Sequence, residues 1–184
     1  MVVINSLEER EDLDPFTQIY HTYFAKLYNY IYYRVGEVHV TDDLVSEVFS
    51  KVIEKYQTYD PEKGKFKTWL FTIAHNTVIN FYKKNSYNKY HLELSLAETV
   101  ESGVRIEDEV VNKELQKILS GAVMVLDEPK RSIIALKFGG CLTNRQIAEV
   151  LQMSESNVGT IIHRALKELK GLLNEQGYNI KSLG

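Results

Sequence analysis

The segments TDDLVSEVFSKVIEKY (residues 41–56) and FKTWLFTIAHNTVINFYKK (residues 66–84) decide the fold. In the first segment, apolar residues recur from Leu44 to Ile53 with the spacing of one stripe along an α-helix. The second segment has the same helical period. Thr41 is of a residue type that caps helix N-termini, so we expect the first helix to begin there. The two segments predict a pair of packed amphipathic helices.

The polar face of the first helix is acidic. It carries Asp43 and Glu47, with Ser50 and Glu54 further along. Such a face is usually only a solvated surface when it is considered alone. Beside the second segment, however, it is also a candidate protein-binding face.

The second segment combines amides, aromatic rings and cations. Between Lys63 and Lys84 there are five lysines and no acidic residue. Cations that follow a phosphate backbone, next to rings and amides that receive unstacked bases, are typical of single-stranded DNA binding. For Trp69, packing in the core and stacking on a base are both open. The candidate DNA-binding residues are Lys63, Lys65, Phe66, Lys67, Trp69, Asn76, Asn80, Lys83 and Lys84.

The C-terminal part predicts a helix-turn-helix motif. Thr143 and Gln146 have the spacing of a capping box before a short helix, and Ser154 is placed to cap the next helix. An apolar stripe then runs from Val158 to Leu173, which indicates one longer amphipathic helix. The N-terminal part of this second helix would enter the major groove. The candidate duplex-binding residues are Arg145, Ser156, Asn157, Thr160, His163, Arg164 and Lys167.

Helical periodicity dominates the 184 residues, with only three prolines and ten glycines, so we expect an all-α protein. We predict two small helical domains, residues 13–88 and 106–176, joined by a flexible acidic linker, residues 89–105. Residues 1–12 and 177–184 are expected to be tails. The length gives each domain a modest core.

Composition excludes several classes of protein. There is no apolar run of about 20 residues that could span a membrane. A single cysteine, Cys141, fits a reducing cytoplasm. The histidines are scattered, and no Gly-rich phosphate loop or nucleophile elbow occurs. We therefore expect a cytoplasmic binding protein, not an enzyme, with no metal and no cofactor. The net charge of −3 suggests that it reaches DNA as part of a larger assembly.

Two separate motifs resemble one known family, the extracytoplasmic-function (ECF) sigma factors of bacterial RNA polymerase. Residues 42–52, DDLVSEVFSKV, are similar to the polymerase-binding part of sigma-70 region 2. Residues 66–84 are similar to the part of region 2 that melts and reads the −10 element. Residues 142–170, LTNRQIAEVLQMSESNVGTIIHRALKELK, are similar to region 4, which reads the −35 element. The resemblance covers the chain from Asp14 to Leu173.

This resemblance implies specific partners. Core RNA polymerase would be bound through the clamp and flap regions of its large subunits, and promoter DNA as duplex at −35 and as single strand at −10. A base flipped out of the single strand would be accepted by the loop from Asp60 to Thr68, with Asn76 and Asn80. An anti-sigma factor is a further candidate partner. The residues implied to face the polymerase clamp are Asp43, Ser46, Glu47 and Phe49.

The chain departs from the family at one place. Many relatives have two basic residues flanking a hydroxyl early in the recognition helix, but here the residues are Gly159, Thr160 and Ile161. Gly159 would allow close backbone approach to DNA, or else direct readout by this helix is weak. Phosphate contacts are then expected to rest on Arg164 and Lys167, with Arg145 as a third candidate.

An ordinary helix-turn-helix regulator, with an N-terminal dimerisation or sensory domain, is the alternative. It explains the C-terminal half equally well, but it leaves the pattern from Lys63 to Lys84 unexplained. Such a regulator should dimerise and bind duplex DNA alone. A sigma factor should be monomeric when free and need polymerase to bind a promoter well.

Overall fold

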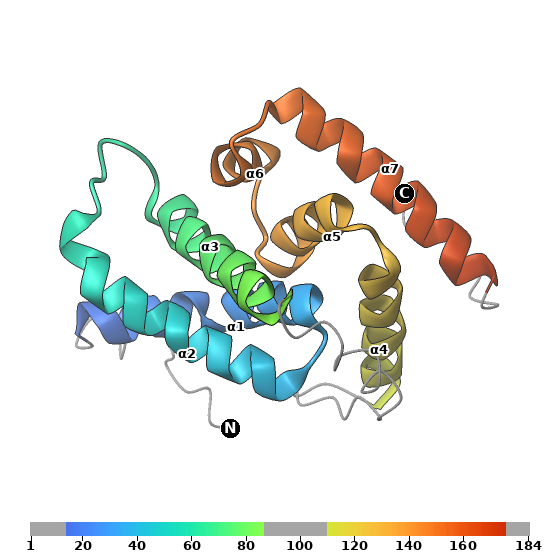
Figure 1. Cartoon of the computed structure of the whole chain (residues 1–184), viewed down its shortest axis with the longest axis horizontal. Helices are drawn as coiled ribbons and strands as arrows, with labels where there is room; N and C mark the ends of the chain where they lie inside the picture. The colour runs from blue at the N-terminus through green and yellow to red at the C-terminus, as the bar shows by residue number, and fades with distance from the viewer. Residues whose placement is uncertain (1–13, 87–109, 176–184) are drawn as a thin grey trace, which may run out of the picture.

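A computed structural model describes residues 14–86 and 110–175 of the chain, and these ranges contain helices and no strands (Figure 1). The predicted all-α class is confirmed. No helix in these ranges is both long and apolar enough to cross a membrane. The predicted tails 1–12 and 177–184 and the linker 89–105 lie outside the described residues. The elements are α1 (Pro15–Val35), α2 (Val38–Lys55), η2 (Tyr56–Thr58), α3 (Phe66–Ser86), α4 (Val110–Val125), α5 (Glu128–Ile134), η4 (Ala135–Gly139), α6 (Asn144–Leu151) and α7 (Glu155–Glu175).

Helix α1 has well-marked ends. The Asp14 carboxylate accepts hydrogen bonds from the backbone N–H groups of Phe16 and Thr17, and Pro15 occupies the first helical position. Gly36 ends the helix with φ of +73°, in the left-handed region that glycine adopts without strain. Both ends are therefore set by residue types that favour a helix terminus.

Helix α2 begins three residues earlier than we expected. Its cap is Glu37, whose carboxylate oxygens accept the backbone N–H groups of His39 and Val40, each at 2.8 Å. Thr41 is buried within the first turns, and its hydroxyl donates to the Glu37 carbonyl at 2.7 Å. The prediction that Thr41 caps this helix was therefore wrong. Glutamate is an uncommon cap, which is why the sequence did not reveal it.

The first three helices share an apolar core. The predicted stripe of α2 is buried as far as Val52, but Ile53 is 57% exposed, so its assignment to the core was wrong. The buried stripe of α3 runs from Leu70 to Val78 and includes the fully buried Phe71. The core residues contributed by the three helices include Leu27, Tyr30, Ile31, Leu44, Val45, Val48, Val52, Leu70, Phe71, Ala74 and Val78.

Helices α4 to α7 form the second part of the molecule. Helix α5 begins at the Asp127 cap with Pro129 in its first turn, and it ends in the π-helical segment η4. Of the predicted stripe on α7, Val158, Ala165 and Leu173 are buried, whereas Leu166 is 43% exposed and does not belong to the core.

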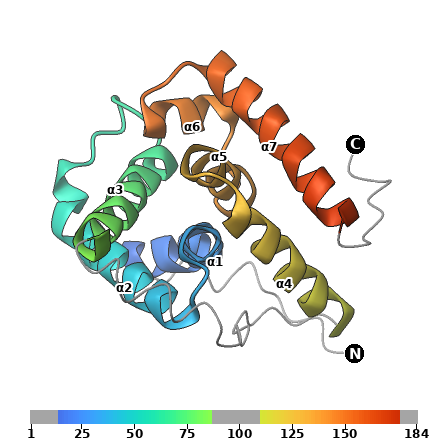
Figure 2. The same cartoon turned by 45° about the vertical axis from the view of Figure 1, so that its right-hand side comes forward.

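The two parts lie against one another and share one core. Figure 2 shows α1 nearly end-on, between α2 and α3 on one side and α4 and α5 on the other. Side chains from η4, α6 and α7, including Leu136, Ile147 and Val158, belong to the same buried cluster as Leu27 and Val48. The two predicted domains are therefore docked in this structure.

Candidate nucleic-acid and protein interfaces

One face of α2 is exposed and acidic. Asp43, Ser46 and Glu47 are all exposed, as a docking face requires. Glu47 is held by an ion pair with Lys51 at 2.5 Å, four residues further along the helix. Such surface pairs contribute little to stability, so Glu47 remains available to a partner.

Phe49 does not share this exposure. Its side chain is 5% exposed, and its ring lies under the rings of Phe16 and Tyr20, with centroid distances of 6.2 and 4.9 Å. Its position on the predicted polymerase-facing surface is therefore corrected, because Phe49 belongs to the apolar stripe of α2. Its buried ring packs beneath the exposed acidic face of α2.

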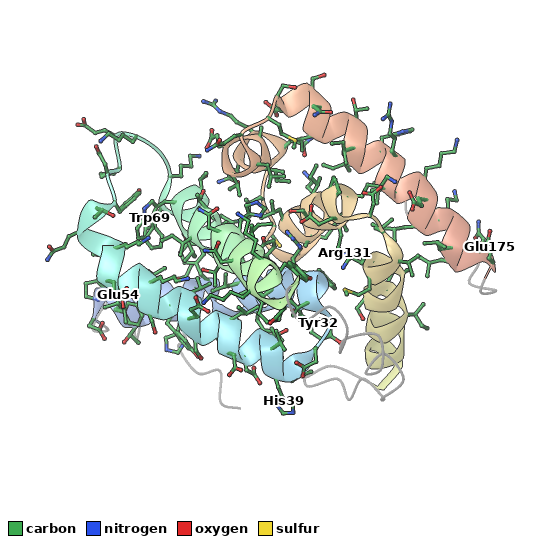
Figure 3. The ribbon with its side chains drawn as sticks, in the orientation of Figure 1. Tyr32, His39, Glu54, Trp69, Arg131 and Glu175 are labelled. Atoms are coloured by element: carbon green, nitrogen blue, oxygen red, sulfur yellow. The ribbon has the colours of Figure 1, made fainter. Side chains whose placement is uncertain are left out.

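Sequence reasoning missed an apolar border to the acidic face. Ile53 and Tyr56, at the C-terminal end of α2 and just after it, are 57% and 44% exposed, and Tyr20 of α1 is 38% exposed. Figure 3 shows the neighbouring Glu54 at this same end of α2. The exposure could not be read from periodicity, because Ile53 keeps the spacing of the buried stripe.

An aromatic cluster fixes the start of α3. The Phe66 ring lies 5.6 Å from Tyr23, 5.2 Å from Tyr59 and 5.4 Å from Trp69, measured between centroids. Phe66 and Trp69 are each half-buried, and Figure 3 shows Trp69 at the N-terminal end of α3 beside the preceding loop. Each ring thus combines packing with a solvent-facing edge. The contribution of Tyr23 and Tyr59 to this cluster was not predicted, although the number of tyrosines in the sequence indicated that aromatic clusters would form.

The loop before α3 is held by its own polar groups. The Asp60 carboxylate accepts the backbone N–H of Glu62 at 3.0 Å and pairs with the Lys63 ammonium at 3.2 Å. The Tyr59 hydroxyl donates to the carbonyl of Gly64 at 3.1 Å. The lysines of this loop, Lys63 and Lys65, are exposed. The loop is therefore held in shape beside the aromatic cluster and presents two lysines to solvent, next to Asp60 and Glu62.

The amides of α3 lie where the sequence predicted. Asn76 and Asn80 are both exposed, one turn apart on the same face, and Lys83 and Lys84 at the end of the helix are also exposed. Lys67 differs from them. It is half-buried, its ammonium donates to the Cys141 carbonyl at 2.5 Å, and burial followed by the nearby Lys26 charge lowers its pKa.

His75 lies on the inner side of α3. Its Nδ1 is 3.4 Å from the Tyr30 hydroxyl, and burial together with the positive charge of Arg34 lowers its pKa from 6.5 to about 4. Burial also raises the pKa of Tyr30 to about 12. Both side chains are neutral at physiological pH and contribute to packing. Among the described residues, no group of acids, histidines or cysteine could hold a metal.

The helix-turn-helix motif forms as predicted. Thr143 and Gln146 make the reciprocal capping box of α6, with distances of 3.0 and 3.2 Å. Gln152 adopts a left-handed conformation, with φ of +54°, in the turn. The Ser154 hydroxyl then accepts the backbone N–H of Asn157 at 3.2 Å and starts α7. Val158 is fully buried and anchors the first turn of α7 to the core.

The predicted duplex-binding side chains are all exposed, but some of them already make hydrogen bonds or ion pairs within the chain. The Thr160 hydroxyl donates back to the carbonyl of Ser156 at 3.0 Å, and Arg145 pairs with Glu149 at 3.4 Å. Arg164 and Lys167 lie further along α7. The exposed set consists of Arg145, Ser156, Asn157, Thr160, His163, Arg164 and Lys167.

Two family models match this chain. Sigma-70 region 2 matches residues 19–87, and sigma-70 region 4 matches residues 116–169. The first match contains α2, α3 and the aromatic loop. The second contains the helix-turn-helix motif. The two models therefore account for both candidate interfaces, in the order that the resemblance implied.

Relatives and solved structures agree with these matches. The chain is 31% identical over 176 residues to the ECF RNA polymerase sigma factor SigW of Bacillus subtilis, covering 91% of this chain and 93% of SigW. It is 29% identical over 161 residues to SigX of the same organism, covering 85% and 82% of the two chains.

Two solved structures share the fold. One is the sigma factor RpoE in complex with the anti-sigma factor NepR from Bartonella quintana, with a TM-score of 0.68, 20% identity, and coverage of 88% of this chain and 98% of that one. The other is CnrH in complex with the cytosolic domain of CnrY, with a TM-score of 0.64, 22% identity, and coverage of 87% and 88%. This chain therefore belongs to the ECF family of sigma-70 RNA polymerase sigma factors, binding subunits that direct core RNA polymerase in transcription initiation.

Proposed function

We propose a division of labour between three surfaces of this sigma factor. The acidic face of α2 binds the clamp of core polymerase through Asp43, Ser46 and Glu47. The α3 face, with the exposed lysines of the preceding loop, binds the single-stranded −10 element, and α6 with α7 binds the −35 duplex. One observation carries this proposal: Asn76 and Asn80 are exposed together on a helix that is bracketed by lysines and fixed by an aromatic cluster.

The chemistry of the −10 surface suits an unpaired strand. Exposed lysines in the loop and at the end of α3 would follow the phosphates, and the amides between them have donors and acceptors for base edges. The half-buried Phe66 and Trp69 pack against the ring of Tyr59, at the start of the loop, and remain partly exposed. A flipped base would be accepted between the loop and the amides.

Further partners follow from the family. Region 4 would also contact the flap of polymerase. An anti-sigma factor is a candidate regulator, since the related RpoE and CnrH were both solved with a bound partner chain. The apolar border formed by Tyr20, Ile53 and Tyr56 is a surface that such partners could cover. The place of action would be the cytoplasm, where core polymerase is found.

The docking face can be tested by charge reversal. The variant Asp43→Lys/Glu47→Lys should lose co-elution with bacterial core RNA polymerase on a sizing column, with affinity reduced about 100-fold or more, because unlike charges at the interface become like charges. Both residues are exposed, so the fold should survive, and circular dichroism would verify this.

A matched control is Glu62→Lys/Glu175→Lys, which changes the net charge equally at two other exposed positions. It should co-elute as the wild type does. Retained binding by the Asp43/Glu47 variant would contradict the clamp assignment. A wild-type chain that runs as a dimer and shifts duplex DNA without polymerase would instead support a conventional helix-turn-helix regulator.

A further inference from the structure

One side chain links the acidic face of α2 to the helix that carries the amides. The Lys51 ammonium donates to the Glu47 carboxylate at 2.5 Å and to the Thr77 hydroxyl of α3 at 3.1 Å. Glu47 belongs to the acidic face, and Thr77 directly follows Asn76 in α3. Lys51 therefore contacts both of the region 2 surfaces to which different partners are assigned above.

The Thr77 hydroxyl is a polar group in an apolar interface. Thr77 is 2% exposed, and buried residues close to it or to Lys51 in the sequence, such as Val48, Ala74 and Val78, are apolar. A buried hydroxyl costs free energy unless it has a hydrogen-bond partner, and the Lys51 ammonium is such a partner. Because a hydrogen bond is directional and apolar contact is not, this bond favours one rotation of α3 against α2.

The rotation of α3 decides where its amides point. Successive residues of an α-helix are about 100° apart around the axis, so the inward position of Thr77 turns Asn76 outward. Asn80 follows one turn later, and both amides are exposed. The hydrogen bond between Lys51 and Thr77 therefore bears on the orientation of the proposed base-reading face.

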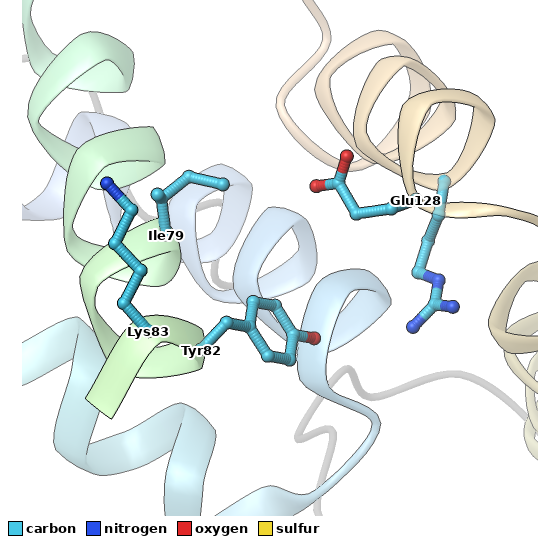
Figure 4. Close-up of a pocket in the computed structure, with 5 residues that line it drawn as sticks. Ile79, Tyr82, Lys83 and Glu128 are labelled. Carbon is cyan, nitrogen blue, oxygen red and sulfur yellow. The ribbon is translucent and has the colours of Figure 1, made fainter. Parts of the chain in front are cut away.

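Another flank of α3 restrains the helix less. Figure 4 shows Ile79 and Tyr82 of α3 facing Glu128 of α5 across an open cavity of about 430 Å³. Side chains that line a cavity make fewer contacts than side chains in a close-packed core. More of the restraint on the rotation of α3 is therefore left to its contacts with α2.

On the docking face, the same ammonium acts against a cationic partner. Glu47 has to give up or share its ion pair with Lys51 when such a partner approaches, and the Lys51 charge itself repels the partner. Ion pairs between exposed side chains contribute little free energy, so this penalty is small. Removing the Lys51 charge should therefore strengthen polymerase binding modestly.

We propose that Lys51 is a positioning residue, which orients α3 for the −10 strand and moderates the binding of Glu47 to the polymerase clamp. This inference rests on the proposed function of the two faces. Loss of the Lys51 ammonium should raise the affinity for core polymerase and, at the same time, lower promoter opening by the polymerase that is bound. A residue that merely stabilised the fold would lower both quantities when it was replaced.

Lys51→Met tests this prediction, because methionine keeps the apolar stem and removes the charge. Titration with core RNA polymerase should show binding about two- to fivefold tighter than that of the wild type. Permanganate reactivity of the melted thymines should fall about fivefold on a promoter that the wild-type holoenzyme opens, with the variant at saturating concentration. Lys51→Arg, which restores a cation with several donors, should recover most of both changes.

Thr77→Val separates the two roles of Lys51. It removes the hydroxyl with little change of shape and leaves the ion pair between Lys51 and Glu47 in place. This variant should open the promoter as poorly as Lys51→Met does and bind polymerase as the wild type does. Lys55→Met is the matched control, since it removes the same charge at an exposed position one turn further along α2. It should equal the wild type in both measurements.

Two results would overturn the role of Lys51. One is a Lys51→Met chain that equals the wild type in both measurements, and the other is a fall in both polymerase affinity and promoter opening. The proposed function is decided separately by Asp43→Lys/Glu47→Lys. If that variant lost polymerase binding while Lys51→Met behaved as the wild type, the docking face would stand and only the role of Lys51 would be wrong.

Discussion

Helix α3 and the first half of α7 both present amide side chains to solvent, two on α3 and Asn157 alone on α7, but their charges are arranged differently. The amides of α3 lie between exposed lysines at both ends, in the loop before the helix and at Lys83 and Lys84. Helix α7 begins with Glu155, and its first cation is Arg164. Phosphates can be held on both sides of a base at α3 but on one side at α7. Under the proposed function, we therefore expect base readout mainly from region 2 and positioning of the DNA mainly from region 4.

The largest effect is expected from replacing the amides of α3. Asn76→Ala or Asn80→Ala should leave polymerase binding intact and reduce promoter opening about 10- to 100-fold, because a good contact to a base contributes about 1–3 kcal/mol. Permanganate reactivity of the thymines in the melted region would report opening. Asn174→Ala, an exposed amide at the far end of α7, is the control. Unchanged reactivity in both α3 variants would remove the amides from base readout.

A smaller effect is expected on α7. Arg164→Ala and Lys167→Ala should each weaken holoenzyme binding to a −35 duplex a few-fold, irrespective of its sequence, and each should lower the slope of log affinity against log salt by about 1. Titrations at several salt concentrations measure this slope. Lys170→Ala, an exposed cation further along the helix, should leave it unchanged. A loss confined to one DNA sequence would show instead that α7 reads bases.

The role of α7 can also be tested by a variant that should bind duplex DNA more tightly. A Cβ at Gly159 would have Asn144 Nδ2 at 3.9 Å as its nearest neighbour, so a longer side chain fits there. Gly159→Lys should tighten duplex binding about threefold and add about 1 to the salt slope. Gly159→Ala is the control, since it gives the same gain in helix propensity, about 1 kcal/mol, without the charge. Equal binding by the two variants would place position 159 away from the phosphates.

Local signals in the sequence predicted much of this structure. Asp14, Gly36, Thr143 and Ser154 each mark a helix end through their own backbone geometry, and all four agree with the structure. These local signals failed where the exposure of a side chain depends on which other elements cover it. Ile53 keeps helical spacing and is exposed, because periodicity identifies a face and not its neighbour.

The contact between the two parts of the molecule could not be predicted for a similar reason. The Arg34 guanidinium donates to Glu128 and Ser132, which lie 94 and 98 residues away in the sequence, and nothing in their local sequence marks a pair. An arginine is expected at the surface unless a partner is known. The Gly139–Gly140 pair precedes the helix-turn-helix motif in the sequence, but its close approach to α1 and Phe71 is a tertiary property that no local pattern marks.

The smallest expected effect is a pH dependence of folding stability that originates in region 2. His75, in region 2, has a pKa of about 4 in the folded chain, below its ordinary value of 6.5, because it is buried near Arg34 and meets the Tyr30 hydroxyl. The unfolded chain therefore binds this proton first as the pH falls. Stability should be full above pH 6.5 and should decline between pH 6.5 and about 4, by at most about tenfold in the unfolding equilibrium constant per pH unit.

Urea unfolding followed by fluorescence of Trp69, the only tryptophan, reports on region 2 and should show this decline between pH 6.5 and 5. Carboxylates with lowered pKa values, such as Asp14 and Asp127, lose their contribution only below about pH 4, so this window isolates the histidine. His75→Gln should flatten the profile, because glutamine carries no proton to gain. A profile that stayed steep in this variant would assign the pH dependence to another group, and region 2 would then not be the acid-sensitive half of the molecule.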